Sequence, residues 1–163
     1  MIETSKRMLA VLLLLGSPFL LGTAQDNDTA AINRFISSQE SLKNGYQAEG
    51  IRTVVTGDLN HDGVPDTAVL YTLEGQNRSN NYLQYLAVFL RRNGRLVHIA
   101  HKEVGGKSFR AIELTSIKDN VIMLKTTDYG EKDPTCCPTI EGSTRYVLNG
   151  ARLKELGSKQ SGR

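Results

Sequence analysis

Residues 82–104 read YLQYLAVFLRRNGRLVHIAHKEV, and this stretch decides the fold class. Two runs rich in apolar and β-branched residues flank Asn93-Gly94, which is the strongest two-residue signal for a β-hairpin. Asn and Gly tolerate the positive φ angles that a tight turn between antiparallel strands requires. We therefore predict strands over Tyr82–Arg92 and Arg95–Val104.

The same alternation of strands and turns continues on both sides of this hairpin, from Gly45 onward. Tight turns are indicated at Lys118-Asp119-Asn120 and at Asn149-Gly150. The pattern predicts six further strands, which together with the first two form an antiparallel meander of about eight strands. These six are Ile51–Thr56, Thr67–Leu73, Phe109–Ile117, Val121–Thr127, Ser143–Leu148 and Ala151–Leu156.

One amphipathic helix precedes the strands. Asp28 or Thr29 can cap its start, and Asn44-Gly45 offers the left-handed exit that ends a helix. Its apolar face is formed by Ile32, Phe35, Ile36 and Leu42. The sequence thus predicts a mainly β (α+β) domain over residues 25–156, in which an N-terminal helix packs on the meander.

The first 24 residues have the features of a secretory leader. Lys6 and Arg7 precede the apolar run Met8–Leu21, and the small residues Gly22-Thr23-Ala24 suit cleavage before Gln25. The 14-residue run is short for a membrane span, which needs about 20 residues. We therefore predict a signal peptide over 1–24 and a secreted or periplasmic protein with no membrane span after leader removal.

Composition is that of an ordinary globular domain. The chain has 163 residues, of which 39% are apolar and 23% charged. Its net charge of +3 falls to +2 without the leader, which is too small for a nucleic-acid footprint or a polybasic membrane patch. The polar stretch Gly157–Arg163, rich in Gly, Ser and Lys, predicts a flexible tail.

The most informative motif is GDLNHDGVPD, residues 57–66. Oxygen donors stand at alternate positions, and Gly63 lies where the chain must turn sharply. A calcium ion needs six to eight converging oxygens, and a cation also offsets the repulsion among three carboxylates. We predict Ca²⁺ ligation by Asp58, Asn60, Asp62, the Val64 carbonyl and Asp66. His61 is predicted to point outward, and a solvated turn without metal is the alternative.

The pattern D-x-N-x-D-G-x-x-D resembles the calcium loops of FG-GAP or VCBS-like (integrin-type) repeats. It is also similar to the first half of EF-hand and dockerin loops, but the twelfth position, where an EF-hand needs Glu, is Val69. Pro65–Val69 runs directly from the loop into a strand. The resemblance covers about 20 residues. It implies an ion-binding hairpin, and not the propeller or the ligand recognition of integrins. We expect a structural role for the ion, because no nucleophile or general base other than His61 stands beside the loop.

Cys136 and Cys137 are the only cysteines. Neighbouring Cα atoms lie about 3.8 Å apart, whereas disulfides prefer roughly 4.4–6.8 Å, so a ring between them is strained. An oxidising compartment nevertheless favours it. A vicinal disulfide that stiffens Asp128–Pro138 is our leading prediction, with interchain bonds and free thiols as alternatives. The surrounding Cys-Cys-Pro-Thr resembles a Cys-Cys-Pro-Ser/Thr motif of small exported bacterial proteins of unknown function.

No catalytic residues are predicted. His98 and His101 are three apart in a predicted strand, which places them on opposite faces, where they cannot share a metal. We expect a non-enzymatic binding module of the cell envelope, whose partner is another envelope protein or a glycan. The alternative function is an envelope hydrolase or thiol-redox protein with a site near the calcium and Cys-Cys loops.

Overall fold

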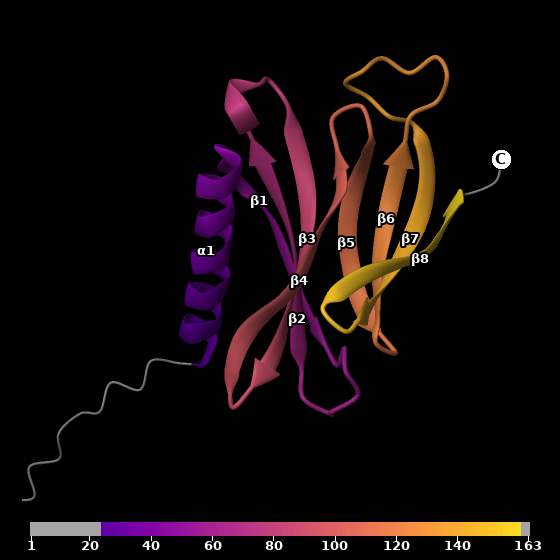
Figure 1. The fold of residues 1–163 in the computed structure, drawn as a ribbon. Coiled ribbons are helices and arrows are strands. Elements are labelled where there is room, and N and C mark those ends of the chain that lie inside the picture. The colour runs from indigo at the N-terminus through magenta and orange to yellow at the C-terminus, as the bar shows by residue number, and fades with distance from the viewer. Residues whose placement is uncertain (1–23, 161–163) are drawn as a thin grey trace, which may run out of the picture.

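The computed structural model describes residues 24–160. The predicted leader, apart from Ala24, and residues 161–163 of the predicted tail lie outside this range. One helix is followed by eight strands, and a short 3-10 helix, η1, interrupts the connection between β2 and β3 (Figure 1). The elements are α1 (Ala24–Lys43), β1 (Tyr46–Gly57), β2 (Asp66–Glu74), η1 (Gln76–Arg78), β3 (Tyr82–Arg92), β4 (Arg95–Gly106), β5 (Arg110–Lys118), β6 (Val121–Asp128), β7 (Ile140–Asn149) and β8 (Arg152–Gln160).

The strands form one antiparallel sheet in the order β1 to β8, which confirms the predicted meander. The sheet folds back on itself between β4 and β5. Among the described residues, β4 and β5 pair with each other only at Gly106 and Arg110. Three layers result: α1, the strands β1–β4, and the strands β5–β8 (Figure 1). The confirmed fold class is therefore mainly β, with an N-terminal helix on the sheet.

Strands β2 and β3 are buried on both faces because they form the middle layer. In β2, Val69 and Tyr71 pack toward α1, whereas Ala68 and Leu70 pack toward β5–β8. Side chains alternate across a strand, so the two sets belong to separate cores. This explains why these strands read as continuous apolar runs rather than as alternating ones.

Helix α1 differs from its prediction at both ends. It begins at Ala24, so Asp28 and Thr29 lie inside the helix and do not cap it. Asp28 instead forms an ion pair with Arg91 of β3. Leu42, predicted on the buried face, is 78% exposed. Asn44 has a φ of 49°, which confirms the left-handed helix exit.

The C-terminal strand is longer than predicted. β8 continues to Gln160 and pairs with β7, with Ser143 opposite Lys159. Residues 157–160 of the predicted flexible tail are thus part of the sheet. The polar composition of this segment fits an edge strand, because edge positions tolerate Ser and Lys exposed to solvent.

Candidate functional site

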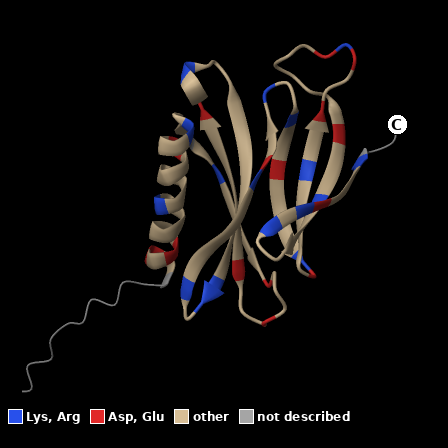
Figure 2. Ribbon diagram, in the orientation of Figure 1, with Lys and Arg blue, Asp and Glu red and all other residues tan. Residues whose placement is uncertain are grey.

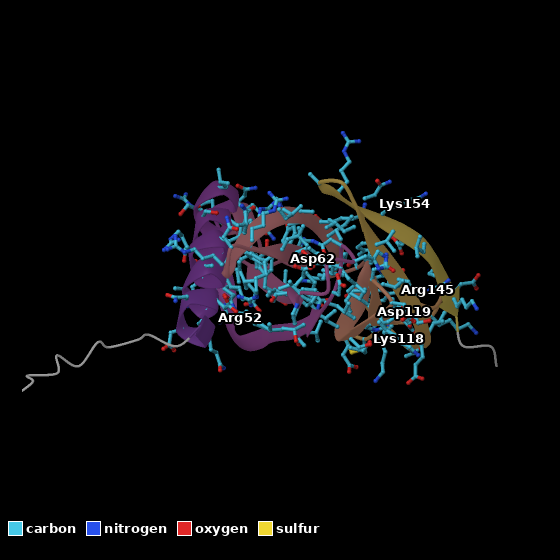
Figure 3. All side chains as sticks on the ribbon, turned by 90° about the horizontal axis from the view of Figure 1, so that it is seen from below. Arg52, Asp62, Lys118, Asp119, Arg145 and Lys154 are labelled. Carbon is cyan, nitrogen blue, oxygen red and sulfur yellow. A yellow bond between two sulfur atoms is a disulfide. The ribbon has the colours of Figure 1, made fainter. Side chains whose placement is uncertain are left out.

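The acidic loop 58–65 connects β1 to β2 at one end of the molecule. Leu59 anchors it, because its side chain is buried in the core between the two sheet layers. His61 and Gly63 adopt positive φ angles of 63° and 78°, which coil the loop tightly. Figure 3, which views the molecule from this end, labels Asp62 in the loop and Asp119 in the β5–β6 turn.

Asp58 organises the loop by accepting backbone hydrogen bonds. Its Oδ1 accepts the N–H groups of His61 at 2.7 Å and Asn60 at 3.1 Å, and its Oδ2 accepts that of Gly63 at 2.9 Å. The Gly63 N–H, supported by those of Asn60 and His61, holds the pKa of Asp58 below its usual value. Asp58 is therefore a carboxylate that stays ionised at neutral pH.

Asn60 and Asp62 continue this arrangement along the loop. The Asp62 N–H donates to Asn60 Oδ1 at 3.1 Å, and the Val64 N–H donates to Asp62 Oδ1 at 2.8 Å. Asn60 Nδ2 also donates to Asp62 Oδ2 at 2.8 Å. Asp58, Asn60 and Asp62 thus lie on one coiled turn, and the side chains of Asn60 and Asp62 are exposed to solvent.

Asp66 is the exception, because it is fully buried. Its Oδ2 accepts the Leu59 N–H at 3.0 Å, and its Oδ1 accepts the Arg91 N–H at 2.8 Å. The carboxylate therefore ties the loop to both β2 and β3. Arg91 adds a second tie, since its Nε donates to the Pro65 carbonyl at 3.2 Å. Figure 2 shows acidic residues of the loop and basic residues around the β3–β4 turn at this same end.

The donor set of the loop fits a hard cation in type and spacing. Every predicted ligand is an oxygen, and each carboxylate oxygen that accepts a single hydrogen bond, such as Asp58 Oδ2, retains further lone-pair capacity. Within residues 24–160, no three His, Cys, Asp or Glu side chains are already clustered as a metal site. Asn60 and Asp62 are exposed, so their side chains can reorient toward an ion, whereas Asp58 is half-buried and held by three backbone N–H groups.

The second motif forms the predicted vicinal disulfide. Cys136 and Cys137 are bonded to each other, with their Cα atoms 3.8 Å apart. Asp133 closes the neck of the same loop: its Oδ2 accepts the N–H groups of Gly130 and Thr139, each at 2.8 Å. The Gly130 N–H is the main reason why the pKa of Asp133 lies below its usual value. The β6–β7 loop is therefore ordered by both covalent and polar contacts.

The two motifs lie at opposite ends of the molecule. Asp66 begins β2 at the acidic-loop end, whereas Glu74 ends β2 opposite Tyr82 at the other end. At this other end, Gly106 of β4 pairs with Arg110 of β5, and Arg110 pairs with Asp128 at the end of β6. The disulfide loop follows Asp128, so it lies at this end as well. Nine residues of β2 span roughly 25 Å at about 3.3 Å per residue. No single site can include both loops.

A cavity of about 310 Å³ lies beside the disulfide. It is lined by Tyr46, Glu74, Gly75, Ser79, Asn80, Asn81, Tyr82, Lys107, Thr135 and Cys136. Of these residues, only Cys136 was predicted from the sequence to belong to a site. The others come from four separated segments, and the one local signal is the Asn- and Ser-rich stretch 77–81, which is longer than a tight hairpin turn needs.

The prediction for His98 and His101 is wrong. Their ring centroids lie 5.5 Å apart, and both rings contact Phe35 of α1. Val88 pairs with Ala100 but Phe89 pairs with His98, so Ile99 is an extra residue in β4. Such a bulge shifts the alternation by one and brings both histidines to the helix face.

Comparisons of the chain with known protein families, with curated proteins and with solved structures found no match. None of the described helices is long and apolar enough to cross a membrane.

Proposed function

We propose that the protein is an exported, non-enzymatic binding domain of the cell envelope whose β1–β2 hairpin is stabilised by Ca²⁺. Asp58, Asn60, Asp62, the Val64 carbonyl and Asp66 would hold the ion. Its role is structural: it neutralises the carboxylates and keeps the hairpin end closed.

One observation carries this proposal. Asp58 collects three backbone N–H groups around its carboxylate, and this coils the loop so that Asn60 and Asp62 occupy the same turn. Two negative charges, on half-buried Asp58 and exposed Asp62, then remain on one short loop. Arg91, the nearby cation, is already paired with Asp28. A bound divalent cation would offset that excess charge.

Thermal unfolding with Ca²⁺ and with chelator tests the proposal. Ligand binding adds RT ln(1 + [L]/Kd) to the free energy of unfolding. Extracellular-type sites bind at about 10⁻⁴–10⁻³ M, so millimolar Ca²⁺ should add about 0.5–1.5 kcal/mol. We expect the melting temperature to rise by roughly 2–6 °C.

Asp62→Asn is the decisive variant, because it keeps the side-chain shape and removes one charge. It should lose the calcium-dependent rise and should melt no lower than the wild type in chelator. His61→Asn is the matched control: Asn tolerates the positive φ of 63° at this position, so the calcium response should persist. A melting curve that Ca²⁺ moves no further than Na⁺ at equal ionic strength would contradict the calcium proposal.

A further inference from the structure

The cavity beside Cys136 has walls that are fixed before any ligand arrives. On one side, Gly75 and Asn77 adopt positive φ angles of 67° and 53° around η1, and the Gly75 N–H donates to the Asn81 carbonyl at 3.1 Å. On the other side, the disulfide and Asp133 hold the β6–β7 loop. Preformed walls reduce the ordering cost of binding.

Tyr46 is an exposed aromatic side chain held in one place. The residue is 58% exposed, and its Oη donates to Glu74 Oε2 at 3.3 Å. The ring also lies against the backbone of Gly75, where an added Cβ would come within 2.7 Å of Tyr46 Cε1. A fixed, exposed ring offers a flat apolar surface at the cavity, and Tyr82 supplies a second aromatic wall.

The polar groups of the cavity suit a ligand that carries hydroxyls. Hydroxyl and amide side chains both donate and accept hydrogen bonds, as each sugar hydroxyl does. Glu74 adds an acceptor, and Lys107 adds a donor whose Nζ is positioned by the Asn80 carbonyl at 2.9 Å. These two charges are opposite in sign, so the cavity has no net charge that would favour an ion. The side chains that both donate and accept are Ser79, Asn80, Asn81 and Thr135.

We propose that this cavity binds a neutral glycan unit of one or two sugar rings, with Tyr46 as the stacking platform. The volume of about 310 Å³ is at the lower end of small-molecule sites, which are about 300–1,000 Å³. The proposal rests on the proposed function as a binding domain and extends it by naming the ligand class.

The test titrates the full exported chain with four sugars: glucose, cellobiose, N-acetylglucosamine and its β-1,4-linked disaccharide. Binding is followed by isothermal titration and by chemical-shift changes at the cavity residues. At least one sugar should bind at or below about 10 mM, and Tyr46→Ala should weaken it about tenfold or more. Tyr46 is exposed, so this variant keeps the fold, which its melting curve verifies.

Two further variants sharpen the result. Gly75→Ala retains the tyrosine but displaces its ring, and should also weaken binding. Phe109→Ala is the matched control, because Phe109 is an exposed aromatic residue of the neighbouring β4–β5 turn that does not line the cavity. It should bind sugar as the wild type does.

Binding of none of the four sugars at about 10 mM would overturn the glycan site, as would equal affinity in Tyr46→Ala. Tighter binding of free glycine or glutamate than of any sugar would also overturn it. These results leave the calcium response untouched, because the acidic loop lies at the opposite end of β2. Loss of the calcium response with sugar binding intact would instead reject the calcium hairpin alone.

Discussion

Phe35 stands at the centre of an aromatic cluster between α1 and the sheet. Its ring stacks on His98 at a centroid distance of 3.9 Å and meets Phe89 edge-on at 5.6 Å. His98 Nε2 is buried, with no hydrogen-bond partner among the described residues. Burial, reinforced by the neighbouring His101, lowers the pKa of His98 to about 4. The folded protein thus keeps this imidazole neutral.

The neutral His98 makes stability depend on pH. Its pKa is about 6.5 in an unfolded chain and lower in the fold, so the unfolded state takes up more protons between these values. The contribution is fully present above about pH 6.5 and is lost as the pH falls toward 4. We expect the free energy of unfolding to drop by about 1–2 kcal/mol between pH 7 and pH 4.5, measured by urea unfolding.

His98→Phe is the control for this effect. It keeps an aromatic ring against Phe35 and removes the titrating group, so the loss of stability between pH 7 and pH 4.5 should shrink. An unchanged pH profile in this variant would show that other groups cause the loss.

The prediction for His98 and His101 failed because one extra residue in β4 shifted the alternation of side chains between the two faces of the sheet. Ile99 is apolar like its neighbours Val97 and Ala100, so nothing in the local sequence marks it as the bulge. The bulge becomes visible only when β4 is paired with β3, where Phe89 faces His98. The Cys136–Cys137 bond, by contrast, was predicted from the adjacency of the two cysteines and an expected oxidising compartment, and the bond is confirmed.

At the scale of the element, α1 is attached through one narrow apolar stripe. Ile32 and Ile36 are buried against the sheet, whereas Leu42 extends into solvent beyond the stripe. The spacing of apolar residues predicted the helix but also included Leu42, because periodicity does not show where the sheet beneath the helix ends.

Two alanine substitutions on this helix compare a buried aliphatic side chain with an exposed one. Ile36→Ala should lower the free energy of unfolding by about 2–4 kcal/mol, because it leaves a cavity in a packed core. Leu42→Ala should change it by no more than about 0.5 kcal/mol. Urea unfolding of both variants measures the difference. Equal losses would mean that Leu42 is buried in solution.

The turns show which elements local sequence can predict. Asn93 and Gly94 both have positive φ, as do Asp119 and Asn120, in agreement with the predicted tight turns. The cavity was not predictable in this way. Tyr46, Glu74 and Lys107 are far apart in the chain, and they meet only because the strand register brings three connections to one end.

For the whole molecule, a partly buried polar network around Arg110 connects strands of the β5–β8 layer and reaches β4 through one hydrogen bond. Arg110 Nη1 lies 3.2 Å from Glu155 Oε1, and Arg110 Nη2 donates to Tyr146 Oη at 3.0 Å. Its Nε donates to the Val104 carbonyl at 2.7 Å. Burial alone would raise the pKa of Glu155, but hydrogen bonds from Thr144, Tyr146 and Arg110 outweigh it and lower the pKa.

Arg110→Met should destabilise the protein by about 2–4 kcal/mol, because it leaves Glu155 partly buried without its cation. Adding Glu155→Gln to this variant should recover about 1 kcal/mol or more, since the uncompensated charge is then removed. Urea unfolding of the two single variants and the double variant gives the coupling energy. Strict additivity of the two losses would show that the pair is not coupled.

The meander and its helix were predicted from the sequence, but the folding of the sheet into two layers was not. The turn at Lys107–Phe109 reads like any other hairpin connection, and the signal for layering lies in β2 and β3, whose apolar runs are continuous. Both faces of these strands need a cover, and α1 can supply only one. The second cover has to come from β5–β8.

The single bridging pair at Gly106 and Arg110 has a further consequence. Neighbouring strands of a sheet normally hold each other by a row of backbone hydrogen bonds, which are indifferent to side-chain identity. Here the two halves of the chain meet almost entirely through side chains, as two separate proteins do when they associate. Complementary shape and apolar contact therefore decide how the two halves pack, together with a few hydrogen bonds such as that from Arg110 Nε to the Val104 carbonyl.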